Sequence, residues 1–203
     1  MDIYLIRHGE TDWNRMKKLQ GTTDIPLNAY GIELAEKTAE GLKDVPFDRI
    51  YTSPLIRARK TAEIIRGDRP IEIIETDGLK EISFGDYEGL CYLPDNYTIP
   101  KPGFRKFFDD PEHYDTPPHG ESLLHLRERT SSLVRSIMDD PANENMTFLM
   151  AAHGAAIRGI LSGLQNLPLA EFWSGPVHKN CGVTKLHVEH GKFNIEFENR
   201  LYY

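Results

Sequence analysis

The sequence predicts an α/β fold, a three-layer sandwich in which helices cover both faces of a mostly parallel central sheet. Short apolar segments typical of buried strands alternate along the chain with segments of helical periodicity. Strands separated in this way by helices form a parallel sheet. Near the C-terminus, two alternating polar and apolar segments flank His190-Gly191 and indicate a hairpin, which adds an antiparallel edge.

Four apolar segments predict the strands of the parallel part. They cover residues 3–6, 47–52, 71–74 and 146–152. Side chains two positions apart in a strand point to the same face of the sheet. In the hairpin, the apolar side chains expected on one face are therefore Leu186, Val188, Phe193, Ile195 and Phe197.

Helical periodicity predicts helices over residues 29–43, 54–65, 120–138 and 155–164. Asn28 can cap the first helix, whose narrow face of small side chains indicates close packing on the sheet. Ser53 followed by Pro54 is typical of an N-cap and a first helical position. Arg57 then lies near the positive end of that helix dipole. Ser122 is either an N-cap of the third helix or a substrate contact.

Two segments lack a regular pattern. Residues 12–26 are expected to form a loop. Residues 91–119, rich in proline and aromatic side chains, are expected to form a lid or insertion that roofs the active site. A chain of 203 residues is long enough for one domain with a sizeable core and too short for two ordinary ones. We therefore expect a single domain over residues 1–203.

Composition argues against two classes of partner. A formal net charge of -7 and a pI near 5.6 disfavour nucleic acid and anionic membranes as general partners. We find no apolar run long enough to cross a bilayer, and the first residues enter a strand directly, so we expect no leader. Cys91 and Cys181 are expected to be free buried thiols, as in a cytoplasmic protein. The sequence sets no oligomeric state.

Two histidines share one local context. His8 and His153 each follow a predicted buried strand and precede a glycine. Because the carboxyl ends of parallel strands lie along one edge of a sheet, both imidazoles can converge there with Arg7 and Arg57. Guanidinium groups suit phosphate oxygens, and a glycine after His8 is expected to let a ligand approach the backbone closely. These residues predict a phosphate site in which either imidazole could be the nucleophile.

A series of short motifs runs in order from residue 3 to about residue 164. The motifs are Arg7-His8-Gly9-Glu10-Thr11, Trp13-Asn14, Gln20-Gly21-Thr22, Thr52-Ser53-Pro54-Leu55-Ile56-Arg57-Ala58, Leu79-Lys80-Glu81-Ile82-Ser83-Phe84-Gly85 with Gly89, and Ala152-His153-Gly154. This ordered set resembles the histidine phosphatase superfamily, the group that includes the cofactor-dependent phosphoglycerate mutases. The resemblance implies a small phosphorylated substrate, with no metal and no cofactor needed for the chemistry.

The resemblance also implies roles for individual residues. His8 would attack phosphorus and form a phosphohistidine, while His153 would donate to the transferring oxygens. Arg7 and Arg57 would hold the phosphoryl group, and Glu81 would protonate the leaving oxygen. We therefore expect Glu81 to be partly buried or close to the bound phosphate. Further phosphate or substrate contacts are implied for Asn14, Gln20 and Gly21, although mutases commonly carry serine where Gln20 stands.

Two enzyme activities and one non-catalytic role fit these residues. A phosphatase lets water attack the phosphohistidine, whereas a mutase returns the phosphoryl group to a retained phosphoglycerate. The mutases that the chain resembles have a longer insertion between the acid and the second histidine, whereas only residues 82–152 separate them here. By that comparison the resemblance implies a phosphatase. Lys101, Arg105 and Lys106 could instead grip a substrate carboxylate in a mutase, or form a solvated face. A phosphate-binding regulatory module is the third possibility.

Other side chains in the irregular segment have ordinary explanations. His113, His119 and His125 lie in or near this segment and match no spacing typical of metal ligands, so we expect solvated or lid histidines. Four aromatic side chains could line a substrate pocket or simply pack, namely Trp13, Phe104, Phe107 and Phe108.

Overall fold

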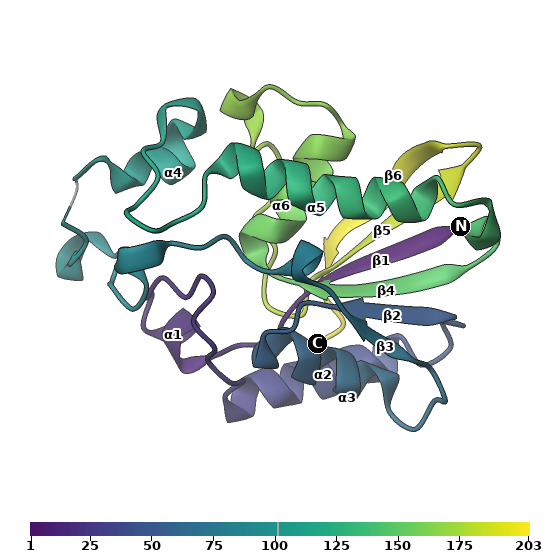
Figure 1. Cartoon of the computed structure of the whole chain (residues 1–203). Helices are drawn as coiled ribbons and strands as arrows, with labels where there is room; N and C mark the ends of the chain where they lie inside the picture. The colour runs from purple at the N-terminus through teal and green to yellow at the C-terminus, as the bar shows by residue number, and fades with distance from the viewer. Residues whose placement is uncertain (101) are drawn as a thin grey trace.

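A computed structural model describes residues 1–100 and 102–203 of the chain. Six strands form one sheet in the order β3-β2-β4-β1-β5-β6. Strands β1, β2, β3 and β4 pair in parallel, whereas β5 pairs antiparallel with β1 and β6. The bounds of the strands are Asp2–Arg7 (β1), Arg49–Thr52 (β2), Ile73–Glu75 (β3), Thr147–Ala152 (β4), Val183–Glu189 (β5) and Lys192–Arg200 (β6). The predicted mostly parallel sheet with an antiparallel C-terminal edge is confirmed (Figure 1).

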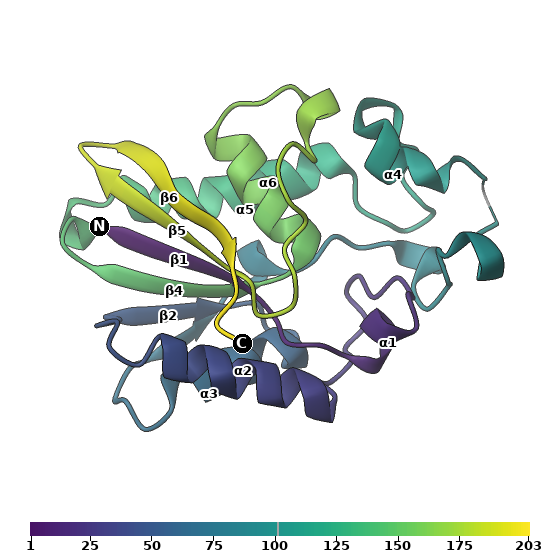
Figure 2. The ribbon, with the colours of Figure 1, turned by 180° about the vertical axis from the view of Figure 1, so that it is seen from behind.

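Helices cover the sheet from both sides, which gives the predicted three layers. Helices α2 and α3 pack on one face and α5 and α6 on the other, as the two opposite views show (Figures 1 and 2). The bounds of these helices are Ala29–Gly41 (α2), Ile56–Arg66 (α3), Leu123–Met138 (α5) and Gly154–Leu164 (α6). The side chain of Asn28 accepts an N–H bond at the start of α2, as the sequence predicts. Ser122, for which the sequence left a cap and a substrate contact open, accepts an N–H bond at the start of α5.

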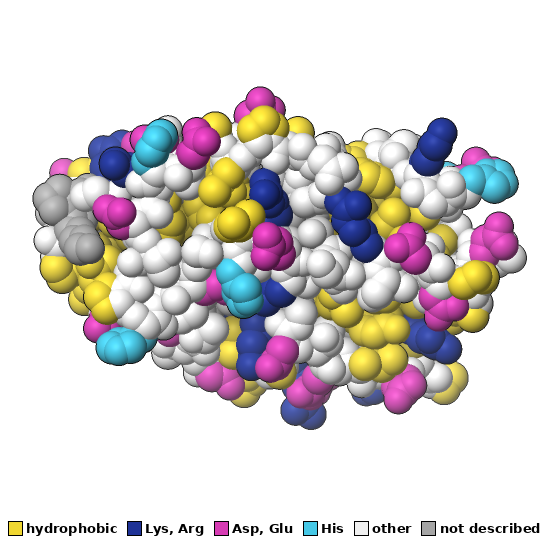
Figure 3. Space-filling view, turned by 45° about the horizontal axis from the view of Figure 1, so that its top comes forward, with side chains coloured by type: hydrophobic (Ala, Val, Ile, Leu, Met, Phe, Trp, Pro, Cys, Tyr) yellow, Lys and Arg dark blue, Asp and Glu magenta, His cyan; other side chains and the backbone are white. Residues whose placement is uncertain are grey.

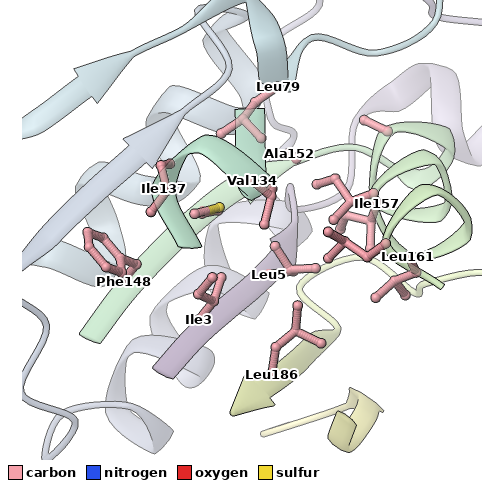
Figure 4. Packing of buried hydrophobic residues seen from close by; sticks show 14 of the residues in the cluster. Ile3, Leu5, Leu79, Val134, Ile137, Phe148, Ala152, Ile157, Leu161 and Leu186 are labelled. Atoms are coloured by element: carbon pink, nitrogen blue, oxygen red, sulfur yellow. The ribbon is translucent and has the colours of Figure 1, made fainter. Parts of the chain in front are cut away.

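Alternate residues of β1 divide between two apolar cores. Ile3 and Leu5 pack with Val134 of α5 and Ile157 of α6, and Figure 4 shows these side chains converging. Tyr4 and Ile6 belong to the core beneath α2 and α3. Since both faces of the central strand are buried, its register is strongly specified, and this fixes the position of the residues that follow it.

Local sequence patterns misplace three features. Residues 12–26 are not entirely a loop, because α1 (Asp12–Arg15) forms there with Thr11 as its N-cap. Helix α3 starts at Ile56 with Leu55 as the N-cap, so the predicted cap at Ser53 is wrong. Phe197 leaves the face of Ile195, because a register shift between β5 and β6 pairs it with Lys185 and places it in the other core.

The segment over residues 91–119 consists mainly of single turns. Its described part includes the four-residue helix α4 (Lys106–Asp109). Phe104 and Phe107 belong to a third apolar cluster with Phe84, Leu126 and Phe172, so this segment packs on α5 and on the chain after α6. In Figure 1, α1 and α4 lie beyond the carboxyl ends of β1 and β4.

The cysteines and the helices bear on two expectations from composition. Cys91 and Cys181 are both buried and free, as predicted. Within residues 1–100 and 102–203, none of the helices combines the length and the apolar character that a membrane crossing requires.

Candidate active site

His8 and His153 meet at the carboxyl ends of two neighbouring strands. β1 and β4 pair in parallel with Arg7 opposite Ala152, so the residue after each strand lies at the same level of the sheet edge. The His8 N–H donates to the Ala152 carbonyl at 3.0 Å, and the two ring centroids are 5.1 Å apart. The predicted convergence of the two imidazoles is therefore confirmed by the geometry.

One ring nitrogen of His8 is hydrogen-bonded to the backbone, and the other is free to react. Nδ1 lies 2.6 Å from the Gly9 carbonyl oxygen, and since a carbonyl only accepts, Nδ1 must carry the proton. In the neutral ring, Nε2 then holds a free lone pair. Burial, together with the charges of Arg57 and Arg7, lowers the pKa of His8 well below its usual range. The ring is therefore unprotonated at neutral pH, as a nucleophile requires.

His153 is held by a serine that sequence reasoning assigned to a helix cap. Nε2 of His153 lies 2.8 Å from Ser53 Oγ, which also accepts the Leu55 N–H at 3.3 Å. Ser53 Oγ can donate its proton to Nε2, and in that tautomer the ring proton lies on Nδ1. Burial, with the charges of Arg57 and Arg7 and the neighbouring His8, lowers the pKa of His153. A neutral ring with Nδ1–H can donate one hydrogen bond to an anion.

The Arg57 guanidinium is fully buried and fixed by two carbonyl groups. Its terminal nitrogens donate to the Gly21 carbonyl at 2.6 Å and to the Thr23 carbonyl at 2.8 Å. Burial lowers the pKa of Arg57 to about 10, against the opposing effect of Glu81 and Asp24, so the group stays charged at neutral pH. The Arg57 guanidinium is held by carbonyl groups that carry no full charge. Its positive charge is therefore available to a ligand.

Three buried nitrogen atoms at this place have no partner among the described residues. They are Nε of Arg7, Nε of Arg57 and Nδ1 of His153. Arg7 is otherwise anchored by a 2.6 Å bond from a terminal nitrogen to the His178 carbonyl. A buried donor without an acceptor costs about 1–3 kcal/mol, so three of them together indicate a site built for an anion.

Glu81 lies at the N-terminus of α6, which begins directly after His153. Its Oε1 accepts the N–H groups of Ile82 (3.1 Å) and Ala156 (2.9 Å), and its Oε2 accepts that of Ala155 at 3.2 Å. The side chain is half-buried, as expected, and it borders the same cavity as His8. Oε2, with one backbone bond instead of two, has more capacity for a proton.

A cavity of about 150 Å³ brings most of the predicted residues together. Asn14 Oδ1 accepts from the Thr11 N–H, and Gln20 Oε1 accepts from the Thr11 hydroxyl, so one threonine orients both amides. Gly21 has a φ of +52°, and a Cβ there would lie 2.0 Å from Glu88. The predicted residues that line the cavity are Arg7, His8, Asn14, Gln20, Gly21, Arg57 and Glu81, whereas His153 is buried beside His8.

Several residues at the cavity escape prediction from the sequence. Asn180 donates to the His8 carbonyl at 3.0 Å, and the cavity lining also includes Lys18, Tyr92, Trp173 and Val177. Of the aromatic candidates, Phe107 and Phe108 line this cavity, whereas Trp13 and Phe104 do not. Neither Asn180 nor Trp173 belongs to a motif named above. An aromatic side chain after a helix is too common to indicate a binding site.

Gly9 serves packing rather than ligand approach. A Cβ at Gly9 would lie 2.4 Å from the Gly31 carbonyl oxygen, and a Cβ at Gly31 would lie 2.1 Å from the Glu10 carbonyl oxygen. The Gly9 N–H also donates to Thr61 Oγ1 of α3 at 3.0 Å. The expectation that this glycine makes room for a ligand is thus corrected: it lets α2 press against the segment after His8.

The three histidines in and near the irregular segment do not line this cavity, although His125 borders a neighbouring hollow together with Glu81. His113, His119 and His125 each face a different carboxylate, those of Asp110, Asp86 and Glu121 respectively. All three are exposed. That the chemistry needs no metal stays a prediction.

The fold and the site define a class: an α/β protein with an anion pocket of paired imidazole and guanidinium groups at the carboxyl ends of its strands. A family model described as histidine phosphatase superfamily (branch 1) matches residues 3–200. The chain therefore belongs to the histidine phosphatase superfamily.

Individual relatives support this assignment. The chain is 41% identical over 160 residues to a Bacillus subtilis protein named uncharacterized phosphatase PhoE, covering 79% of this chain and 75% of that protein. It is 33% identical over 195 residues to a probable phosphoglycerate mutase GpmB of Escherichia fergusonii, covering 95% and 87%. The structure of an Entamoeba histolytica phosphoserine phosphatase mutant with phosphoserine matches with a TM-score of 0.83 and 32% identity, covering 98% and 96%.

The buried histidines make folding stability depend on pH. Burial lowers the pKa of His178 to about 3, and the pKa values of His8 and His153 are lowered too. Below pH 6.5 these histidines therefore become protonated in the unfolded chain but stay neutral in the folded protein. The free energy of unfolding falls as pH falls. From pH 7 to pH 5, His178 alone is expected to account for a loss of about 2 kcal/mol. Urea denaturation at several pH values measures this loss.

A single substitution tests the assignment to His178. In His178→Gln the decrease between pH 7 and pH 5 should be smaller by about the same 2 kcal/mol. His190→Gln, at the exposed hairpin turn, is the matched control and should leave the pH dependence unchanged. An unaltered slope in His178→Gln would contradict the buried, unprotonated state of this imidazole.

Proposed function

We propose that the protein hydrolyses small phosphomonoesters through a phosphohistidine on Nε2 of His8. The observation that carries this proposal is the bond from His8 Nδ1 to the Gly9 carbonyl, which leaves Nε2 as the free nitrogen of a buried, neutral ring. Two guanidinium groups lie close enough to influence the pKa of this ring. A nucleophile and a cradle for a dianion thus occupy one place.

The first step transfers the phosphoryl group to the enzyme. Nε2 of His8 attacks phosphorus in line, the P–N bond forms, and the bond to the ester oxygen breaks. Glu81 gives its proton to the departing oxygen, and Oε2, which faces one backbone N–H only, is the atom we assign to this transfer. In the second step water attacks phosphorus, Glu81 accepts the water proton, and the P–N bond breaks to release phosphate.

The unpartnered donors described above would bind the transferring group. Nε of Arg7, Nε of Arg57 and Nδ1 of His153 would each donate to phosphoryl oxygens, and such charge-assisted bonds are about twice as strong as neutral ones. The side-chain amides of Asn14 and Gln20 would add contacts at the edge of the cavity. Because these donors are already fixed in place, they stabilise the developing charge without reorganisation.

The lining of the cavity supports a phosphatase rather than a mutase. Arg105 and Lys106, candidates for gripping a substrate carboxylate, are exposed and do not line it, and Lys101 lies outside the described residues. The lining includes the aromatic side chains of Phe107, Phe108 and Trp173, with Lys18 as a basic side chain beside Arg7 and Arg57. One relative is named a phosphatase and one similar structure is a phosphoserine phosphatase, which supports the same activity here.

Steady-state assays test the proposal. We expect the purified protein to hydrolyse para-nitrophenyl phosphate without added metal or cofactor, and a panel of phosphorylated metabolites would then identify the preferred ester. Interconversion of 3-phosphoglycerate and 2-phosphoglycerate, with and without 2,3-bisphosphoglycerate, measures the mutase activity. Interconversion faster than hydrolysis would overturn the phosphatase proposal. A protein that neither hydrolyses para-nitrophenyl phosphate nor interconverts the phosphoglycerates would favour a binding module.

Compartment, partners and domain organisation follow as part of this proposal. Two free buried thiols support a reducing compartment such as the cytoplasm. The net charge of -7 supports a small phosphorylated substrate over nucleic acid or membrane. Among the described residues on the face in Figure 3, acidic and basic side chains are interspersed, with no extended basic area. We further propose one domain over residues 1–203, with residues 91–119 as the lid over the active site.

A further inference from the structure

Glu88 lies outside the residues assigned above, and its carboxylate accepts an unusual number of hydrogen bonds. Oε1 accepts the Thr22 N–H at 2.8 Å, the Thr22 hydroxyl at 3.1 Å and the Phe84 N–H at 3.1 Å. Oε2 accepts the Thr23 N–H at 2.8 Å and the Thr23 hydroxyl. A carboxylate offers about four lone-pair sites, so Glu88 is saturated by the loop and by Phe84.

The loop that Glu88 holds is the loop that holds Arg57. The carbonyl groups of Gly21 and Thr23 point at the two terminal guanidinium nitrogens, at 2.6 Å and 2.8 Å. The N–H of Thr22, which belongs to the same peptide group as the Gly21 carbonyl, donates to Glu88, and so does the N–H of Thr23. The loop is therefore a clip with Glu88 on one side and Arg57 on the other.

The loop packs tightly against Glu88 at Gly21. The positive φ of Gly21 and the 2.0 Å separation between a hypothetical Cβ and Glu88 Oε1 leave no space for a side chain. Beyond the loop, Asp24 Oδ1 accepts the N–H of Ile56 at 2.7 Å, which attaches the same segment to the first turn of α3, the helix of Arg57. A displacement at Glu88 would thus reach Arg57 through backbone atoms.

We propose that Glu88 is a positioning residue for the phosphate-binding Arg57, acting through the carbonyl groups of Gly21 and Thr23. This inference rests on the proposed function, because it assigns Arg57 to the phosphoryl group. Glu88 touches neither the substrate nor the reacting atoms. It sets the acceptors that aim the guanidinium, and a misplacement of about 1 Å in such a group can cost about 10²-fold in rate.

Glu88→Gln is the variant that tests the clip. A glutamine amide has one oxygen, and its NH₂ group would face the N–H and hydroxyl donors of the threonines, so the loop must shift. We expect kcat/KM for para-nitrophenyl phosphate, and the affinity for vanadate, to fall about 10- to 100-fold. Glu128→Gln, an exposed glutamate on α5, is the matched control and should match the wild type.

A double-mutant cycle separates positioning from general destabilisation. In an Arg57→Lys background there is no guanidinium group to position. Glu88→Gln should then lower kcat/KM and vanadate affinity less than about twofold. An equal loss with and without Arg57 would overturn the proposal, as would a Glu88→Gln variant with wild-type kcat/KM and vanadate affinity. Thermal unfolding of every variant reports whether the fold is intact.

A milder variant covers the case in which Glu88→Gln does not fold. Thr23→Ala removes one hydroxyl donor to Glu88 and keeps the Thr23 carbonyl. It should lower vanadate affinity to a smaller extent, again only when Arg57 is present, and an effect that persists in Arg57→Lys would count against the clip. Wild-type protein that binds vanadate but hydrolyses no ester would refute the phosphatase proposal, while the vanadate cycle would still test the clip.

Discussion

Replacement of His8 by alanine is expected to reduce kcat for para-nitrophenyl phosphate by at least about 10⁴-fold, the scale seen when a covalent nucleophile is removed. The imidazole supplies the attacking Nε2, which has a free lone pair in a ring that burial holds neutral. His190→Ala, at the exposed hairpin turn, is the control and should retain wild-type kcat.

A covalent intermediate provides an independent measurement. Rapid denaturation of the wild type during turnover of labelled substrate should trap phosphate on the protein in an alkali-stable form, as expected for a P–N bond. His8→Ala should trap none. Residual activity within about tenfold of the wild type, or label that persists in the variant, would show that another group is the nucleophile.

Glu81→Gln is expected to produce the second largest effect, and its size should depend on the leaving group. For phosphoserine, whose departing alkoxide needs a proton, we expect kcat/KM to fall by about 10²–10⁴-fold, the usual contribution of a general acid. For para-nitrophenyl phosphate the fall should be much smaller, because para-nitrophenolate is stable as an anion. The glutamine oxygen can still accept N–H bonds at the start of α6, so the structural contacts are partly retained.

The comparison of the two esters decides the role of Glu81. An equal loss on both would point to a structural contribution at the N-terminus of α6 rather than to proton donation. Glu128→Gln is again the control for the loss of one surface carboxylate. Thermal unfolding of Glu81→Gln shows how much of the effect comes from weakened backbone contacts with Ala155 and Ala156.

The strands, and with them the main site, could be predicted because the signal is local. A buried apolar run followed by histidine and glycine occurs twice, and the parallel pairing of β1 and β4 brings the two ends together. Composition and periodicity do not say which of the parallel strands are neighbours in the sheet. The sequence therefore indicated that His8 and His153 share an edge of the sheet, and the structure supplied the 5.1 Å between their rings.

Contacts between distant segments explain what the sequence did not reveal. Ser53 has the local context of a helix cap, yet its hydroxyl lies beside the ring of His153, 100 positions away. Glu88 has an ordinary local context, and four of its five bonds form only when the loop after Gln20 reaches it. Phe197 follows a strict alternation that one register shift reverses.

The mutual approach of Gly9 and Gly31 links the nucleophile to a helix that takes no part in phosphate binding. Neither position has room for a methyl group, so an alanine at Gly31 would push α2 and the backbone that carries His8 apart. Substitutions in the outer helical layer can therefore alter turnover without touching the cavity. Variant libraries built to improve this enzyme's surface should keep both residues as they are.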